Sequence, residues 1–410
     1  MFSAKEIILS EIKPALGCTE PAAIALNGAY LKSINPHAET ITLTINTNLL
    51  KNAAYVPIPN TNRSYGVKFA FALGYLFGDK NDGLNIFKNI TPQKVKKAKE
   101  FEKNIELNIK EGNEIYIKSM ADEYEVLTYG YHDFIKLIKT PEKTMEFSSQ
   151  KTSSDTKTIE NWLKNQDFEI IYSLLDEDFS FLKDTVDMNL NLSNTAFSKE
   201  CGLNIGKSHP HNTLENKIIS VTTAASDARM EGVNAPAMSL FGSGNHGIAA
   251  TLPVWIYAKE KGFSENEAYR AIGLSMLITI YIKLFIGRLS PVCGAAFASG
   301  CGVGGAIAYL EKGKTASINA VKFVINSING VICDGAKMGC SLKVMLGAQN
   351  GYKAAMLAIK DTPVFEDGIL EKDITKTIKN LQKITDSMKK VDKTITDIMI
   401  SKQLSQTQAH

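Results

Sequence analysis

Six cysteines are the residues of this sequence with the most versatile chemistry. The N-terminal stretch MFSAKEIILSEIK lacks the basic start and unbroken apolar segment of a signal peptide, so we expect a cytoplasmic protein without a disulfide framework. Reduced thiols can serve as bases, nucleophiles or metal ligands. The last four fall within 48 residues, and the six are Cys18, Cys201, Cys293, Cys301, Cys333 and Cys340.

Cys18 lies in ALGCTEPAAIAL (15–26), just before a predicted helix over 21–33 with Thr19 or Glu20 as N-cap. Unpaired N–H groups and the macrodipole at a helix N-terminus favour a thiolate. We therefore expect a lowered pKa for Cys18 and treat it as a candidate reactive thiol. The alternative is a small apolar core residue.

Cys293, Cys333 and Cys340 are all predicted at helix ends. SPVC (290–293) indicates a helix start with Cys293 in its first turn, and VICDGAKMGCS (331–341) indicates a turn between helices. Backbone N–H groups at such ends can hydrogen-bond sulfur. Three thiolates suit either a Cys₃His zinc site or an iron–sulfur cluster with one open iron. The C-x₆-C spacing is a weak motif alone, so a purely structural role stays open.

Cys301 is predicted to have a different role. It lies eight residues beyond Cys293 in a predicted helix over 291–313, roughly 12 Å along the axis at ~1.5 Å per residue. One small cluster does not easily use both thiols, so we expect Cys301 to pack in the core.

Three sequence blocks decide between these alternatives: GCTEPAAIAL (17–26), SPVCGAAFASGCGVGGAIAYL (290–310) and GVICDGAKMGCSLKV (330–344). Together they closely resemble the L-cysteine desulfidase family, which is related to the α-chain of bacterial iron–sulfur L-serine dehydratases. The resemblance runs over nearly the whole chain. The serine dehydratase relatives have a longer interval between their last two ligand cysteines and lack the GCTEP block, which favours a thiol substrate.

The resemblance implies a four-iron, four-sulfur cluster held by Cys293, Cys333 and Cys340, with Cys18 as the catalytic base. The open iron would bind the substrate sulfur as a Lewis acid, so no pyridoxal phosphate is required. Loss of sulfide from L-cysteine would leave aminoacrylate, which yields pyruvate and ammonia. The alternatives are an L-serine dehydratase, a non-catalytic iron–sulfur redox or sulfur-carrier protein, and a cysteine nucleophile beside a structural metal.

The substrate's carboxylate and ammonium also need polar contacts. LFGSGNHGIAATL (240–252) is a glycine-rich loop that enters a helix, where free N–H groups suit a carboxylate. NTNLLKN (46–52) follows a predicted strand and offers amides and a lysine. Both segments could instead be structural. The substrate-binding candidates are Asn48, Lys51, Asn52, Ser243, Gly244, Asn245, His246, Arg288 and Lys337.

The elements that must position these residues indicate an α+β fold. We predict a mainly helical cluster-binding domain with an inserted smaller α+β domain that contains an antiparallel sheet. The expected division is N-terminal helices over 1–35 that pack on the helical domain, an α+β domain over 36–205 and a helical iron–sulfur domain over 206–410. The predicted strands are 39–50, 105–110, 114–121, 124–130 and 133–140. The predicted C-terminal helices are 214–230, 246–262, 265–287, 291–313, 315–332, 341–360 and 369–401.

Composition sets limits on the partners. The 410 residues are 44% hydrophobic and 22% charged with a formal net charge of +3, which gives no electrostatic case for nucleic acid. The apolar stretch 271–289 is interrupted by Lys283 and Arg288, so we expect a buried core helix and no membrane span. L-Cysteine is the expected small-molecule partner, and a homo-oligomer stays open.

Overall fold

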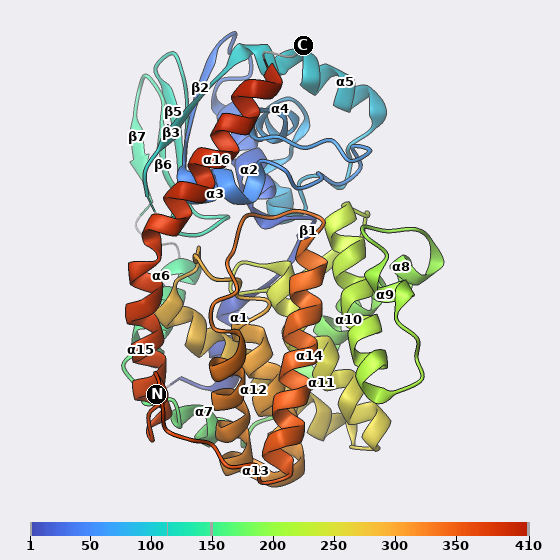
Figure 1. The fold of residues 1–410 in the computed structure, drawn as a ribbon. Helices are drawn as coiled ribbons and strands as arrows, with labels where there is room; N and C mark the ends of the chain where they lie inside the picture. Colours follow the sequence, from blue (N-terminus) through green and yellow to red (C-terminus); the bar gives the residue numbers. More distant parts are fainter. Residues whose placement is uncertain (1, 113, 148–150, 408–410) are drawn as a thin grey trace.

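The computed structural model describes residues 2–112, 114–147 and 151–407, which form two stacked units (Figure 1). The sheet unit (15–147) is built around six strands and lies at the top of the view. The helical unit (2–12 and 151–387) lies below it. The buried apolar side chains form a separate cluster in each unit, so each unit packs its own core.

The sheet unit contains a mixed sheet in the order β3-β2-β4-β5-β6-β7. β2 and β3 are parallel, and the other neighbours are antiparallel. Parallel strands need a crossover, and three helices lie between β2 and β3 in the chain. The strands are β2 (Ile41–Asn46), β3 (Ile105–Lys110), β4 (Tyr116–Ala121), β5 (Tyr124–Tyr129), β6 (Ile135–Lys139) and β7 (Thr144–Glu146). The helices are α2 (Thr19–Ile34), α3 (Thr47–Ala53), α4 (Val67–Phe77) and α5 (Pro92–Phe101).

Helix α2 is fixed to the sheet by a buried amide. Asn27 Nδ2 donates to the carbonyl of Ile117 at 3.2 Å and to Thr128 Oγ1 at 3.0 Å, and Ser119 Oγ donates to Asn27 Oδ1 at 2.6 Å. On its other side α2 packs closely on α4 at Gly74, which has no side chain. A Cβ at Gly74 would lie 1.9 Å from the carbonyl oxygen of Ala25 in α2. The position of the α2 N-terminus, where Cys18 lies, is therefore set by the sheet.

The helical unit surrounds α12, whose most apolar window is 89% buried. Of the described helices only α12 is long and apolar enough to cross a membrane, and its burial confirms the expected core helix. The helices are α1 (Ala4–Glu11), α6 (Lys151–Lys164), α7 (Ile170–Ser173), α8 (Lys183–Ser198), α9 (Ile205–Ser208), α10 (Leu214–Glu231), α11 (Gly244–Lys261), α12 (Glu265–Ile286), α13 (Ala298–Ile328), α14 (Cys340–Ile359) and α15 (Ile374–Ser387). The last helix, α16 (Lys389–Thr407), leaves this unit and packs on α3 (Figure 1).

A two-stranded antiparallel sheet joins the units. β1 (Ile12–Leu16) leads from α1 of the helical unit to α2 of the sheet unit, and it pairs with β8 (Pro236–Leu240) of the helical unit. Its register runs from Ile12 opposite Leu240 to Leu16 opposite Pro236. The chain therefore crosses between the two cores along a paired strand.

The expected fold class is confirmed, with corrections to its parts. The sheet is mixed, not purely antiparallel, because β2 lies between β3 and β4 and pairs in parallel with β3. The predicted strand over 39–50 ends at Asn46, and 47–53 is helix α3. Helix α1 packs on α6 and α12 of the helical unit, whereas α2 belongs to the core of the sheet unit. The domain boundaries at 35 and 205 stay a prediction.

Three of the predicted helices differ from the structure. The segments 291–313 and 315–332 form one helix, α13, which begins at Ala298 and is kinked at Gly313. The segment 369–401 is divided into α15 and α16. The other four predicted C-terminal helices agree with α10, α11, α12 and α14 within two residues at each end.

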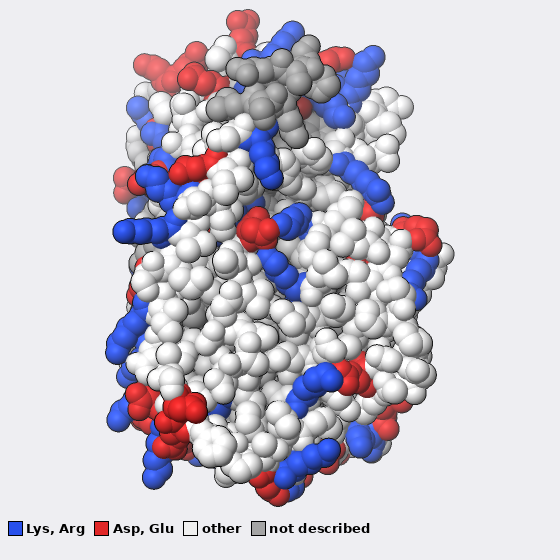
Figure 2. All heavy atoms as spheres, in the orientation of Figure 1, with Lys and Arg blue, Asp and Glu red and all other residues white. Residues whose placement is uncertain are grey.

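The surface carries no single-sign patch on the face drawn in Figure 2, where basic and acidic side chains are interspersed. The broad area over α13 and α14 carries few charged side chains. Leu342 and Ile332 are exposed apolar residues beside the last two cysteines in the chain. The same region also carries the partly exposed ion pairs of Asp334 with Lys337 and Lys343.

Candidate functional site

Cys293 and Cys333 are held together by the backbone. The N–H of Cys293 donates to the carbonyl of Val331 at 2.7 Å, and the N–H of Cys333 donates to the carbonyl of Pro291 at 2.8 Å. This antiparallel bridge corrects the expectation that Cys293 lies in the first helical turn: its segment is extended, and α13 starts later. Tertiary pairing has overridden the local helix signal. The bridge brings two thiols, 40 residues apart in sequence, to the same place.

Cys340 is positioned by the cysteine loop, the connection from 329 to 340. Its N–H donates to the carbonyl of Lys337 at 2.9 Å, and its Sγ lies 3.6 Å from the carbonyl oxygen of Gly335. Gly335 has φ +96°, and a Cβ there would lie 2.2 Å from the carbonyl oxygen of Lys51. The loop therefore rests directly on α3 of the sheet unit.

Cys18 reaches the same place from the sheet unit. It is the N-cap residue of α2, in place of the expected Thr19 or Glu20. Gly17 precedes it with φ +72°, and the positive φ lets the chain turn sharply from β1 into α2. Cys18 is 5% exposed and packs with Met230 and Cys340. The N-terminus of α2 thus faces the cysteine loop.

The protonation state of Cys18 differs from the expected one. Burial and the Glu20 carboxylate raise its pKa, and Cys18 Sγ donates to Glu20 Oε2 at 3.2 Å. The carboxylate is ionised: burial alone would raise the pKa of Glu20, but nearby His132 and the hydrogen bond from Cys18 lower it to about 2. His132 Nε2 lies 3.9 Å from Glu20 Oε1. Cys18 is therefore a protonated thiol that donates to the Glu20 carboxylate. Burial and the charge of Glu20 raise its pKa by more than the positive potential of the helix N-terminus lowers it.

All four of these thiols line one cavity of about 90 Å³. Five of the nine predicted substrate-binding residues line it as well, and they come from α3, from the start of α11 and from the segment after α12. These five are Asn52, Ser243, Asn245, His246 and Arg288. Cys201 and Cys301 are buried elsewhere, as expected for packing of Cys301.

The donor set of the cavity consists of soft thiols, which suit an iron–sulfur cluster. Within the described ranges, no three His, Cys, Asp or Glu side chains are grouped closely enough to hold one metal ion. A tetrahedral zinc site would bring its sulfurs within about 3.8 Å of each other. Burial and the neighbouring thiols of Cys333 and Cys340 raise the pKa of Cys293 to about 12, and burial raises that of Cys340. These thiols can ionise together only beside a strong positive charge, and soft thiolates are the usual ligands of iron–sulfur clusters.

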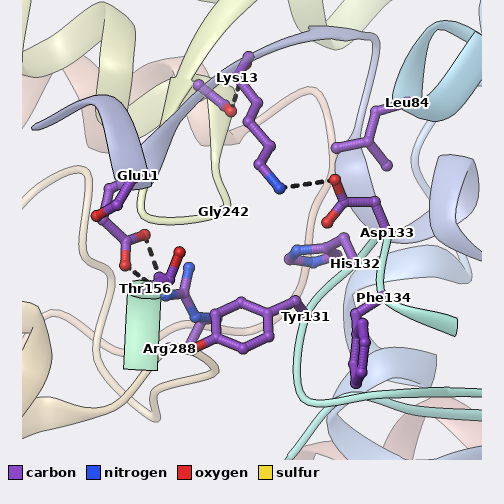
Figure 3. Close-up of a pocket in the computed structure, with 12 residues that line it drawn as sticks. Glu11, Lys13, Leu84, Tyr131, His132, Asp133, Phe134, Thr156, Gly242 and Arg288 are labelled. Carbon is purple, nitrogen blue, oxygen red and sulfur yellow. Dashed lines mark hydrogen bonds and ion pairs between the residues drawn. The ribbon is translucent and has the colours of Figure 1, made fainter. Parts of the chain in front are cut away.

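Arg288 lines the cavity, but its guanidinium is already paired (Figure 3). Its Nη2 donates to both Glu11 carboxylate oxygens, at 2.9 and 3.0 Å, and to Glu160 Oε1 at 2.5 Å. The guanidinium carbon also lies 3.9 Å from the ring centre of Phe241 and 5.0 Å from that of Tyr131. Arg288 therefore ties α1 to α6 instead of offering a free cation to a substrate.

A second, smaller cavity of about 80 Å³ adjoins the first (Figure 3). The two cavities share His132, Gly242 and Arg288 in their walls. The outer side of the second cavity carries an ion pair between Lys13 and Asp133 at 2.7 Å, and both side chains are partly exposed. His132 thus lies between this pair and the thiols.

The other predicted contacts are not in the cavity wall. Lys51 is buried in an ion pair with Asp392 of α16 at 2.6 Å. Lys337 pairs with Asp334 and is 42% exposed on its side chain. Asn48 is buried without lining the cavity. Gly244 does not line it either, and it lies against the Arg229 side chain. Of the three candidates in the stretch 46–52, only Asn52 lines the cavity, because residues 47–53 are helical and their side chains point in different directions.

The buried side chains of His246 and Lys283 lie beside Gly294, the residue after Cys293. His246 Nδ1 lies 3.2 Å from the carbonyl oxygen of Leu240, and a Cβ at Gly294 would lie 2.3 Å from His246 Nε2. Burial and the Lys283 ammonium lower the pKa of His246 well below its usual value, so the ring is neutral. Burial lowers the pKa of Lys283 to about 8, and its Nζ donates to the carbonyl of Arg288 at 3.2 Å.

Four cavity residues were missed in the sequence: Glu20, His132, Arg229 and Lys283. A signal existed for two of them. Arg229 stands in the small-residue run TTAASDARM, and Lys283 interrupts an apolar helix. An ionisable residue inside such a run is buried on folding and needs a partner. No local signal marked His132.

Comparison with known proteins shows the family of this chain. A family model described as the serine dehydratase alpha chain matches residues 81–397, and the chain belongs to that family. Its relatives include UPF0597 proteins. That of Nautilia profundicola is 60% identical over 405 residues, covering 98% of this chain and all of the relative. That of Bacteroides thetaiotaomicron is 37% identical over 423 residues, and that of Clostridium tetani 34% over 415, each covering 97% of this chain and at least 97% of the relative. The expected relation to the serine dehydratase α-chain is confirmed.

Proposed function

We propose that this protein is an iron–sulfur-dependent L-cysteine desulfidase that releases sulfide, pyruvate and ammonia from L-cysteine. The observation that carries the proposal is one cavity lined by four thiols, three from the helical unit and one from the N-terminus of α2. Membership of the serine dehydratase alpha chain family supports a lyase of this kind. The GCTEP block at the α2 N-terminus supports a thiol substrate.

Cys293, Cys333 and Cys340 would hold a four-iron, four-sulfur cluster. When bound, the cluster supplies an open iron, a Lewis acid for the sulfur of the substrate. The bridged backbone of Cys293 and Cys333 and the turn before Cys340 hold these ligands in place. Such preorganisation lets the chain bind a cluster without rearranging its core.

Cys18 would remove the Cα proton of the substrate. Its thiolate must form first, by release to water of the thiol proton that now points at Glu20 Oε2 at 3.2 Å. The cation of Arg229 favours the thiolate, which opposes the effect of burial. Two electrons of the broken C–H bond then form the C=C bond as hydrosulfide leaves. The aminoacrylate product tautomerises, adds water and yields pyruvate and ammonia, which balances the reaction.

The neutral ring of His246 and the amides of Asn52 and Asn245 supply hydrogen-bond acceptors for the substrate ammonium. A basic proton acceptor and a Lewis acid meet the needs of the elimination. Pyridoxal phosphate is therefore not required. Added pyridoxal phosphate is expected to leave the rate of sulfide release unchanged.

The proposal is tested by anaerobic purification followed by three measurements on one sample: iron, acid-labile sulfide, and sulfide release from L-cysteine. Four irons and four sulfides per chain with sulfide release are expected. Exposure to air should remove the activity, because an open iron is easily oxidised. Full activity in iron-free protein would refute the mechanism.

A second candidate function is L-serine dehydratase, which the family match favours. The two activities are separated by the leaving group, which is hydroxide from serine and hydrosulfide from cysteine. Pyruvate formation from L-serine at a kcat/KM above that from L-cysteine would establish this second function. We expect the opposite ratio.

A further inference from the structure

Arg229, in the last turn of α10, is a buried cation whose hydrogen bonds are not all made. It is 4% exposed and lines the cavity with the four thiols. Nη1 lies 3.4 Å from the sulfur of Met230, which is a weak acceptor. Nε and Nη2 have no hydrogen-bond partner among the described residues. A guanidinium buried in this way is costly unless an anion meets it.

The acidic residues close to Arg229 in the chain or in the cavity are already engaged. Asp227 accepts from the N–H of Gly206 at 3.1 Å, and Glu231 pairs with Arg63. Glu20 accepts from Cys18 and from a neighbouring threonine. None of these carboxylates is therefore left to pair with Arg229, which leaves it open to a carboxylate from a ligand.

The guanidinium is also fixed in position. A Cβ at Gly244 would lie 2.2 Å from Arg229 Nε and 2.9 Å from its Cζ, so the group lies directly against the first turn of α11. N–H groups at the start of this 18-residue helix add positive potential on that side. The contrast with Arg288, which is held by two carboxylates, is clear.

We propose that Arg229 binds the carboxylate of the substrate and restricts the site to small 2-amino acids that carry a β-thiol. The inference rests on the proposed function, since the thiol of the same ligand must meet the cysteine side of the cavity. Arg229 and the four thiols line the same cavity of about 90 Å³, so one ligand can meet both. A fork of N–H donors recognises a carboxylate with both of its oxygens, which gives orientation as well as affinity.

The test compares L-cysteine with cysteamine, which has the same thiol and amine but no carboxylate. Anaerobic holoprotein is titrated with each ligand, and binding is read from the ligand-induced rise in Tm, which needs no turnover. Wild type is expected to prefer L-cysteine. In Arg229→Met, L-cysteine binding should weaken by roughly 30-fold or more, as expected for truncation of one partner of a buried charge pair. Cysteamine binding should change by less than about threefold.

Three controls make the outcome decisive. Arg63→Met removes an exposed arginine already paired with Glu231 and should preserve the preference. Gly244→Ala should reduce the preference by displacing the guanidinium, and it replaces Arg229→Met if that variant does not fold. Iron content is measured in every sample.

Equal weakening of both ligands, or loss of iron in Arg229→Met, would mean that Arg229 serves the cluster, and it would overturn the proposal. A wild type without preference for L-cysteine would overturn it too. Failure of the proposed function is a separate result, because it shows as absent sulfide release whatever the ligand preference.

Discussion

The helical unit and the sheet unit contribute to the cavity in different ways. The helical unit supplies Cys293, Cys333 and Cys340 on segments tied together by backbone hydrogen bonds. The sheet unit supplies Cys18 and Glu20 from the tip of one helix, which the sheet orients from a distance. The proposed function would therefore place cluster binding and proton transfer on different parts of the fold, so substitutions should separate them.

Loss of a helical-unit thiol should have the largest effect. Cys333→Ala removes one of three proposed ligands, and iron content should fall to near zero because two thiolates cannot hold the cluster. Cys301→Ala, which removes a buried thiol outside the cavity, should keep its iron. Iron and acid-labile sulfide are measured in both variants. Full iron in Cys333→Ala would refute the ligand assignment.

Loss of the sheet-unit thiol should affect only turnover. Cys18→Ala is expected to keep its iron and its L-cysteine-induced spectral change, while sulfide release falls by at least about 100-fold, since a general base contributes roughly 10²–10⁴ in rate. Cys201→Ala is the matched control and should release sulfide at the wild-type rate. If Cys18→Ala loses its iron, Cys18 is a fourth ligand. If its rate stays normal, another group is the base.

The packing of α16 on the sheet unit can be weakened at a buried ion pair. Lys51 of α3 and Asp392 of α16 are both more than nine-tenths buried, so Lys51→Met leaves an unpaired carboxylate. The free energy of unfolding should fall by about 3–5 kcal/mol in a denaturant titration. Lys393→Met, on the same helix, breaks an exposed, solvent-screened pair and should have a much smaller effect. Equal effects of the two variants would contradict this difference.

The smallest expected effect concerns the reactivity of Cys18. The thiolate is the form that reacts, and the Glu20 carboxylate raises the pKa of the thiol, so alkylation of wild-type apoprotein should stay slow at pH 8. Glu20→Gln removes the negative charge, lowers that pKa and should speed alkylation several-fold, to about tenfold for one pKa unit. Mass spectrometry of the Cys18 peptide over pH 7–10 measures it, with Cys201 as internal reference. Unchanged or slower alkylation would show that burial alone controls this thiol.

Much of the helical unit could be predicted because its boundary signals are local. Ser264 caps α12 with a complete capping box, and Thr213 caps α10. Cys293 was misplaced because Ser290 and Pro291 have the composition of a helix start. The competing backbone bridge joins segments far apart in the chain, which no local pattern reveals.

The sequence pointed to the four thiols of the candidate site, but not to the charged residues Glu20, Arg229 and Lys283 that line the same cavity. Cys18, Cys293, Cys333 and Cys340 meet in one cavity, as the sequence blocks indicated. Arg288 was a candidate contact for the substrate carboxylate, and Glu11 and Glu160 of the chain already pair with it. Whether a cation is paired depends on contacts over more than a hundred residues of sequence, so spacing alone could not distinguish Arg288 from Arg229.

The number of residues in the paired strand β1 determines where Cys18 lies relative to the cavity. Its register is fixed against β8 over five residues, and Cys18 follows only two residues later. Inserting one residue in β1 would shift the chain by about 3.3 Å and turn alternate side chains to the opposite face. The thiol would then miss the cavity although every residue of the site were still present. Insertions should be tolerated in the exposed turn between β6 and β7. They should not be tolerated in β1 (Ile12–Leu16), because its length sets the position of Cys18 relative to the helical unit.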